Sequence, residues 1–219
     1  MNVEAVSVIL KEGMAVSTKL GSGMTWCRNI VYKSEGDSVY LALIEQYLEN
    51  IIIPGSTISI KYVNEYFIYL FEGTITNINP SYPAYLTVRV TNAEEILNSR
   101  LSPRYDVYIA ADLKPEWDDS SCFAVITDIS FGGLAFICNL KFDYNEKLEI
   151  TAHLPSGQKI NARGKIIRKT IKNNVSDYSM QFIEISESNC HLLSKYFSSL
   201  ESEISVLYKQ YLSDVKGKI

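Results

Sequence analysis

Two short stretches near the middle of the chain carry residue types suited to holding a small anion. Residues 99–105 place Arg100 and Arg104 four positions apart, and residues 128–133 supply Asp128 together with a hydroxyl and two glycines. An arginine fork pairs with phosphate oxygens or with the O6/N7 edge of guanine, and its flat face stacks on a base. An aspartate accepts hydrogen bonds from the donors on the opposite edge of guanine. Together the two stretches predict a site for a small anion that carries guanine.

The residues of the second stretch have a functional and a structural interpretation. Asp128 can accept from guanine N1–H and N2–H₂, Ser130 can offer its hydroxyl to the base or a phosphate, and Gly133 can admit a ligand close to the backbone. In the structural interpretation, the same residues form an ordinary turn at a strand end, with local hydrogen bonds and a glycine at positive φ. The two interpretations are compatible, because a turn held in this way is also preorganised.

The order of the two motifs, R-x-x-x-R and then D-x-S-x-x-G, resembles the PilZ family of cyclic di-GMP (c-di-GMP) receptors over roughly the second half of the chain. Arg100 and Arg104 stand at the two family arginines, and Asp128, Ser130 and Gly133 stand at the D, S and G. The resemblance implies that the arginines clamp phosphates and guanine, one of them partly by stacking. An arginine pair alone is typical of any solvated surface, so the inference depends on the two motifs occurring together.

Three further residues are candidate ligand contacts, namely Ser99, Gly132 and Arg168. Some relatives carry an additional arginine at the position of Ser99, associated with a stacked pair of ligands, so the binding of one or of two molecules stays open. Lys165 or Arg168 could add positive charge from the strand expected over residues 159–169. Because residues three apart on a regular strand face opposite ways, we expect at most one of them to do so. The alternative is that both are solvated strand residues.

The composition of the chain limits the classes of function. Among 219 residues, 47% are hydrophobic and 21% are charged, and the net charge is −4. This is enough apolar material for packed cores, but the charge argues against binding of a nucleic-acid polymer or an anionic membrane. No stretch approaches the roughly 18 apolar residues of a membrane-spanning helix. The four cysteines are scattered without a C-x-x-C spacing, so we expect reduced thiols in a cytoplasmic protein.

Residues 1–96 are expected to form an N-terminal domain of short strands. Strand patterns separated by turn signals occur over residues 25–33, 38–43, 57–63, 66–77 and 85–91. Five or six such strands predict a small antiparallel barrel. Its size and position resemble the N-terminal domain of flagellar-brake PilZ proteins. The alternative is an unrelated barrel that merely supports the second domain.

Residues 97–219 are expected to form the PilZ domain, including the linker motif and a long C-terminal helix. Strand patterns occur over residues 105–112, 122–128, 133–138, 147–154, 159–169 and 178–185. From about Ser186 the apolar residues recur every three to four positions, which predicts an amphipathic helix of roughly 20 residues or more that covers a barrel or contacts a partner. Residues 93–97 could form one helical turn before Pro103. The predicted fold is therefore mostly β, with two small antiparallel barrels in tandem, the second of them six-stranded.

The two motifs and the PilZ resemblance together imply a cytoplasmic c-di-GMP receptor, and we expect ligand binding at the interdomain linker to reorient the domains and alter contact with a protein partner. By resemblance, the partner would be a flagellar motor component, with recruitment to the motor base. Motifs for metal-dependent or nucleophilic catalysis are absent from the sequence, so we expect no enzyme activity, no metal and no cofactor besides the regulatory ligand. Two alternatives stay open: an interaction module of PilZ-like fold that needs no nucleotide, and a single-stranded nucleic-acid binder, which would need basic grooves with stacking aromatics.

Overall fold

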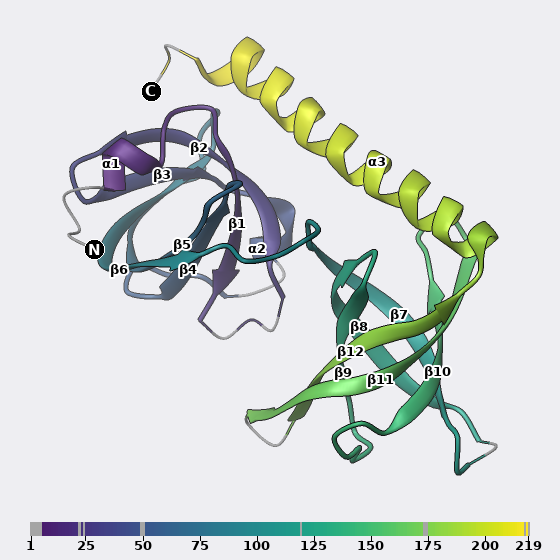
Figure 1. Ribbon diagram of the computed structural model, residues 1–219. Helices are drawn as coiled ribbons and strands as arrows, with labels where there is room; N and C mark the ends of the chain where they lie inside the picture. The colour runs from purple at the N-terminus through teal and green to yellow at the C-terminus, as the bar shows by residue number, and fades with distance from the viewer. Residues whose placement is uncertain are drawn as a thin grey trace. The chain divides into compact units, whose positions relative to one another are not determined.

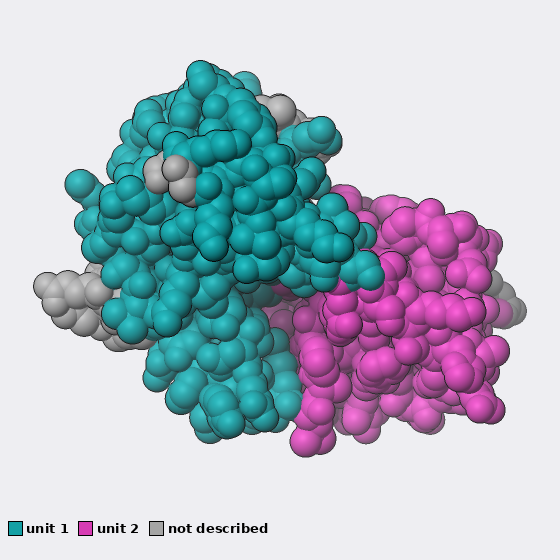
Figure 2. Space-filling model, turned by 90° about the horizontal axis from the view of Figure 1, so that it is seen from above, with its two compact units in different colours: residues 1–100, 202–219 teal, residues 101–201 magenta. Residues whose placement is uncertain are grey.

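The chain forms two compact units, each built around a closed β-barrel (Figures 1 and 2). The computed structural model describes residues 6–21, 23, 25–48, 51–118, 120–172, 175–216 and 218. The first unit contains residues 1–100 and 202–219, and the second contains residues 101–201. The two units are therefore joined twice along the chain, after Arg100 and again after Glu201.

The first unit is a six-stranded antiparallel barrel with two helical turns at its margins. Its strands are β1 (Ala15–Leu20), β2 (Cys27–Glu35), β3 (Ser38–Ala42), β4 (Thr57–Val63), β5 (Phe67–Asn79) and β6 (Tyr85–Leu97), joined in the order β1-β2-β3-β6-β5-β4. The short helices are α1 (Val6–Ile9) and α2 (Glu45–Leu48). In β1, alternate side chains point into the interior, where Val16, Thr18 and Leu20 are buried.

The second unit is also a closed six-stranded antiparallel barrel. Its strands are β7 (Tyr105–Pro115), β8 (Cys122–Ser130), β9 (Gly133–Cys138), β10 (Lys147–His153), β11 (Lys159–Lys172) and β12 (Val175–Ile185), joined in the order β10-β11-β12-β9-β8-β7. Val107, Ile109 and Ala111 point into the core of this barrel, as the alternation in the sequence predicts.

A long helix, α3 (Glu187–Gln210), follows the last strand and ends in a π-helical turn, η2 (Tyr211–Val215) (Figure 1). Its N-cap is Ser186, whose Oγ accepts a hydrogen bond from the backbone N–H of Asn189 at 3.3 Å. The first half of α3 packs on the second barrel, and Tyr211 packs with Ile30 in the first unit. Among the described residues, no helix is both long and apolar enough to cross a membrane.

The predicted fold class of two tandem antiparallel barrels with a long C-terminal helix is confirmed. The helical turn considered for residues 93–97 is wrong, because β6 continues as a strand to Leu97. There Ala93 pairs with Phe71, and Leu97 pairs with Phe67 of β5. The long partner strand extends β6 beyond the point where its own pattern of apolar residues fades. The assignment of residues 1–96 and 97–219 to two domains stays a prediction.

Candidate functional site

The D-x-S-x-x-G motif forms the hairpin that joins β8 to β9. Ser130 and Gly133 are paired across the two strands, with Phe131 and Gly132 as the two-residue loop. The hydroxyl of Ser130 is buried in this turn and donates a hydrogen bond to the carbonyl oxygen of Gly133 at 3.1 Å. The structural interpretation of Ser130, a residue that closes its own turn, is therefore observed, and contact with a ligand remains a proposal.

A β-bulge turns Asp128 to the outer face of the barrel. Ile126 pairs with Phe136 and points into the core, but Asp128 pairs with Ala135, so Thr127 is an extra residue on β8. On a regular strand, residues two apart share a face. The extra residue reverses this alternation, and the Asp128 carboxylate consequently projects outward next to the motif hairpin.

Gly133 allows two strands to approach closely. A Cβ placed on this residue would lie 2.1 Å from the backbone oxygen of Met180 on β12. Gly133 is not among the residues with positive φ, so the expectation of a left-handed turn glycine is wrong. The requirement for glycine here comes from strand packing. Gly132 is different, because a Cβ on it would meet no atom within 4 Å.

Arg104 lies beside the outward-facing carboxylate. Its Nη1 is 3.8 Å from Oδ1 of Asp128, and the two side chains are 38% and 26% exposed. An ion pair this exposed contributes little to fold stability. The Arg104 guanidinium and the Asp128 carboxylate are thus accessible and adjacent. Their hydrogen-bonding groups are complementary to the two edges of a guanine.

Arg100 is attached to the first unit. Asn98, two residues earlier, donates its backbone N–H to Tyr66 O at 2.7 Å and its side-chain amide to Asn64 O at 2.8 Å. Its side-chain oxygen in turn accepts the backbone N–H of Arg100 at 3.3 Å. Leu101, which follows, is fully exposed. The two motif arginines are therefore held by different units, Arg100 by the first and Arg104 by the second.

An aromatic cluster connects both motifs to α3 within the second unit. The ring of Tyr105 stacks on Phe197 with centroids 4.4 Å apart, and Phe131 of the hairpin loop meets the same ring edge-on at 4.9 Å. The hydroxyl of Tyr105 donates to Glu201 at 2.6 Å. Packing against Phe197 thus positions Tyr105, which follows Arg104, and the hairpin loop at Phe131, which follows Asp128.

Replacing Phe197 with alanine should destabilise the second unit by about 3–5 kcal/mol, as expected for removal of a buried aromatic ring. We also expect faster amide hydrogen exchange in the loop at Phe131. Both quantities can be measured by denaturant unfolding and hydrogen-exchange mass spectrometry. Phe123→Ala is the matched control, because Phe123 is largely exposed in the same barrel, and it should shift stability by no more than about 0.5 kcal/mol. Equal effects of the two variants would contradict this role for Phe197.

The additional candidates lie at different places. Ser99 is exposed at the end of the first unit, and Gly132 lies in the open hairpin loop. Arg168 is exposed on β11, where it pairs with Ser179 of β12. A bulge between Ile166 and Arg168 breaks the regular alternation of β11, so the expectation that Lys165 and Arg168 face opposite ways is wrong.

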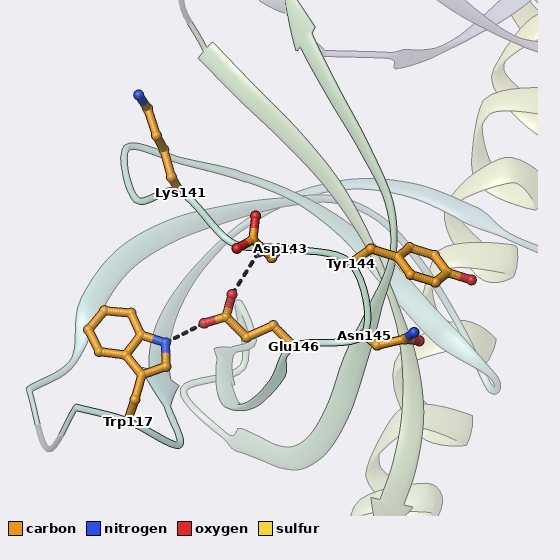
Figure 3. A pocket seen from close by; sticks show the side chains of 6 residues that line it. All are labelled: Trp117, Lys141, Asp143, Tyr144, Asn145 and Glu146. Carbon is orange, nitrogen blue, oxygen red and sulfur yellow. Dashed lines mark hydrogen bonds between the residues drawn. The ribbon is translucent and has the colours of Figure 1, made fainter.

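A surface pocket of about 560 Å³ lies elsewhere on the second unit (Figure 3). Its lining residues are Trp117, Lys141, Asp143, Tyr144, Asn145 and Glu146. Glu146 accepts hydrogen bonds from the Trp117 indole and from the backbone N–H of Asp143 (Figure 3). None of the residues predicted from the two motifs lines this pocket, so it is separate from the candidate site.

The described residues contain no group of three or more side chains that could hold a metal ion. Burial raises the pKa of the Cys138 thiol to about 11, and burial likewise raises the pKa of Cys122. Both thiols are therefore protonated at neutral pH and are poor nucleophiles. The chemistry present at the motif hairpin is that of ion pairing and hydrogen bonding.

A family model matches the second unit: residues 98–199 match the PilZ domain. The matched segment is just under half of the chain, and the match agrees with the PilZ resemblance that the two motifs carry. A search of the curated proteins found no match to the chain.

Three solved structures are similar to the chain over most of its length. YcgR from Escherichia coli, in complex with c-di-GMP, is 17% identical, with 95% of each chain covered and a TM-score of 0.48. The Bacillus subtilis inhibitor of motility MotI/DgrA is 15% identical, covers 88% of this chain and 98% of its own, and has a TM-score of 0.45. PlzA from Borreliella burgdorferi, in complex with c-di-GMP, is 15% identical, with 90% and 92% covered and a TM-score of 0.36.

Proposed function

We propose that the chain is a receptor for c-di-GMP and acts as an effector, without catalysing a reaction. The observation that supports this most is the placement of Arg104 beside Asp128 on the outer face of a PilZ barrel, 3.8 Å apart. Ser130 and Gly133 hold the hairpin that presents Asp128. The complete pair of motifs is present, which favours ligand binding over an interaction module that needs no nucleotide.

In the proposed recognition, two side chains bind different parts of the guanine nucleotide. Asp128 accepts from N1–H and N2–H₂, a pair of donors that adenine does not present in this arrangement. Arg104 pairs with a phosphate or with the O6/N7 edge and can stack on the base. Arg100 supplies a second guanidinium for the other phosphate. Charge-assisted hydrogen bonds of this kind contribute about 1.5–3 kcal/mol each.

Ligand binding would couple the two units, because the two arginines proposed to hold the ligand belong to different units. Arg100 is anchored through Asn98 to the first unit, whereas Arg104 belongs to the second. A ligand that both arginines hold favours the arrangement in which both can reach it, so the population shifts toward that arrangement. We propose that this reorientation alters the surface offered to a protein partner. By resemblance to flagellar brakes, the output is control of motility by a cytoplasmic protein recruited to the motor base.

Titration calorimetry of the full chain tests the ligand. We expect saturable heat with c-di-GMP, an affinity that weakens as salt increases, and no comparable heat with a single-stranded RNA oligonucleotide. The stoichiometry distinguishes one bound molecule from a stacked pair. Absence of heat with c-di-GMP would support the nucleotide-independent interaction module, and tighter binding of RNA would support a nucleic-acid binder.

A further inference from the structure

The surface pocket shown in Figure 3 lies at the opposite end of the second barrel from the motif hairpin. Strand β7 begins at Tyr105, which pairs with Ile129 next to the hairpin, and it ends at Pro115, which pairs with Leu148 near the start of β10. The pocket is formed by the loops that follow β7 and precede β10. A group bound in this pocket is therefore remote from the motif residues.

Hydrogen bonds hold the wall of the pocket in place. The carboxylate of Glu146 accepts from the indole N–H of Trp117 and, at 2.7 Å, from the backbone N–H of Asp143 (Figure 3). The backbone N–H of Asn145 donates to Ile166 O at 2.9 Å, and that of Ile166 donates to Glu146 O at 2.9 Å. The second loop is thus tied to β11, and one carboxylate joins the two loops. Because this wall is already ordered, binding to it requires less ordering of side chains.

Two aromatic side chains are exposed at the pocket. Trp117 is 62% exposed and Tyr144 is 69% exposed. Tryptophan is highly buried on average in folded proteins, and both residue types are enriched among the side chains that dominate protein–protein contacts. The aromatic composition of the pocket is therefore typical of a contact with another protein.

The charged groups at the pocket favour a cation. Two carboxylates, those of Asp143 and Glu146, line it together with one ammonium group, that of Lys141. The Lys141 side chain extends away from Trp117 and Glu146 (Figure 3). Within the part of the chain that the structure describes, the Asp143 carboxylate has no hydrogen-bond or ion-pair partner. The exposed indole and this carboxylate together offer a site for a positively charged group, since a cation is attracted to the face of a tryptophan ring.

An arginine side chain suits both parts of the site. Its planar guanidinium pairs bidentately with a carboxylate and stacks on an aromatic face, whereas a lysine ammonium is a strongly hydrated point charge. Sites for free small molecules bury most of the ligand surface, but five of the six lining residues here are exposed, all except Glu146. This exposure favours an arginine presented by another protein over a free small molecule.

We propose that the pocket at Trp117, Asp143 and Glu146 is a docking site for a protein partner that presents an exposed arginine. The guanidinium would stack on the Trp117 indole and pair with the Asp143 carboxylate, while Glu146 keeps the indole in place. The proposal rests on the proposed function for the existence of a partner and adds the chemistry by which that partner is recognised. Because the pocket is separate from the motif residues, arginine binding and c-di-GMP binding can fail separately.

The test uses a fluorescein-labelled hexa-arginine peptide, titrated with the full chain in the absence of c-di-GMP and followed by fluorescence anisotropy. We expect saturable binding, at least about fivefold tighter than that of a hexalysine peptide. The affinity should fall about tenfold in Asp143→Asn and about twofold to thirtyfold in Trp117→Ala.

Two control variants match these changes. Glu65→Gln removes the same negative charge at an exposed turn between β4 and β5 of the first unit. Phe123→Ala removes an exposed aromatic ring from the second barrel. Both should bind the hexa-arginine peptide as the wild type does. Asp143→Asn should also keep the wild-type affinity for c-di-GMP, which shows that its second unit is folded.

The outcomes distinguish the pocket from general charge attraction. Equal weakening by Asp143→Asn and Glu65→Gln would overturn the docking site, because the peptide would then respond only to the net charge of −4. Absence of peptide binding by the wild type, or equal affinity for hexalysine, would overturn it as well. Loss of peptide binding alone contradicts the docking site, and loss of c-di-GMP binding alone contradicts the proposed receptor.

Discussion

Replacing Arg104 with alanine is expected to abolish c-di-GMP binding, with a loss of affinity of at least about a hundredfold. The guanidinium can form two charge-assisted hydrogen bonds and stack on a base, and its truncation removes all of these contacts. The free energy of unfolding should stay within about 1 kcal/mol of the wild type, because the Arg104–Asp128 pair is exposed. Titration calorimetry and denaturant unfolding measure the two quantities.

The chain provides a matched control for this variant. Arg89 is an exposed arginine that also forms an ion pair with an aspartate, Asp37, at 3.5 Å, but it lies on β6 of the first barrel. Arg89→Ala removes the same charge from the molecule and should leave c-di-GMP binding unchanged. A parallel loss in both variants would mean that net charge, and not the motif, governs binding. Unchanged binding by Arg104→Ala would contradict the proposed site.

The second large effect is expected from Gly133→Ala, which should destabilise the second unit by about 1–3 kcal/mol or more. The added methyl would lie 2.1 Å from Met180 O, and since this atom belongs to the backbone, β9 and β12 must separate to admit it. Thermal unfolding measures the loss. Any accompanying loss of c-di-GMP binding would then follow from the displaced hairpin and would not by itself identify Gly133 as a ligand contact.

The neighbouring glycine is the control for this prediction. Gly132→Ala adds the same methyl one residue earlier, where no atom lies within 4 Å, and should unfold within about 0.5 kcal/mol of the wild type. If Gly133→Ala were as stable as Gly132→Ala, the close approach of β9 and β12 would be wrong.

The architecture could be predicted because its signals are local, whereas the ligand-binding role of the candidate site residues stays a prediction. Turn residues separated the strand patterns, and the alternation of Val107, Ile109 and Ala111 marked the inner face of β7 correctly. The candidate residues of the two motifs were identified from their residue types and spacing. What a sequence motif conveys is which side chains are present and in what order.

The direction in which those side chains point could not be predicted, because it depends on partner strands. The bulges at Thr127 and Ile167 exist only relative to β9 and β12, so counting along a regular strand placed Lys165 and Arg168 on opposite faces. The strand character of residues 93–97 depends in the same way on pairing with β5. The packing reason for a glycine at position 133 could not be predicted, because the atom that excludes a Cβ belongs to Met180, far away in the sequence.

A crystal structure of the full chain with c-di-GMP tests the central claim most directly. We expect ligand density on the outer face of the second barrel, with a guanine against Asp128 and guanidinium contacts from Arg104 and Arg100. Density at the pocket lined by Trp117 and Tyr144, or anywhere that leaves Arg104 and Asp128 without a contact to the ligand, would contradict it.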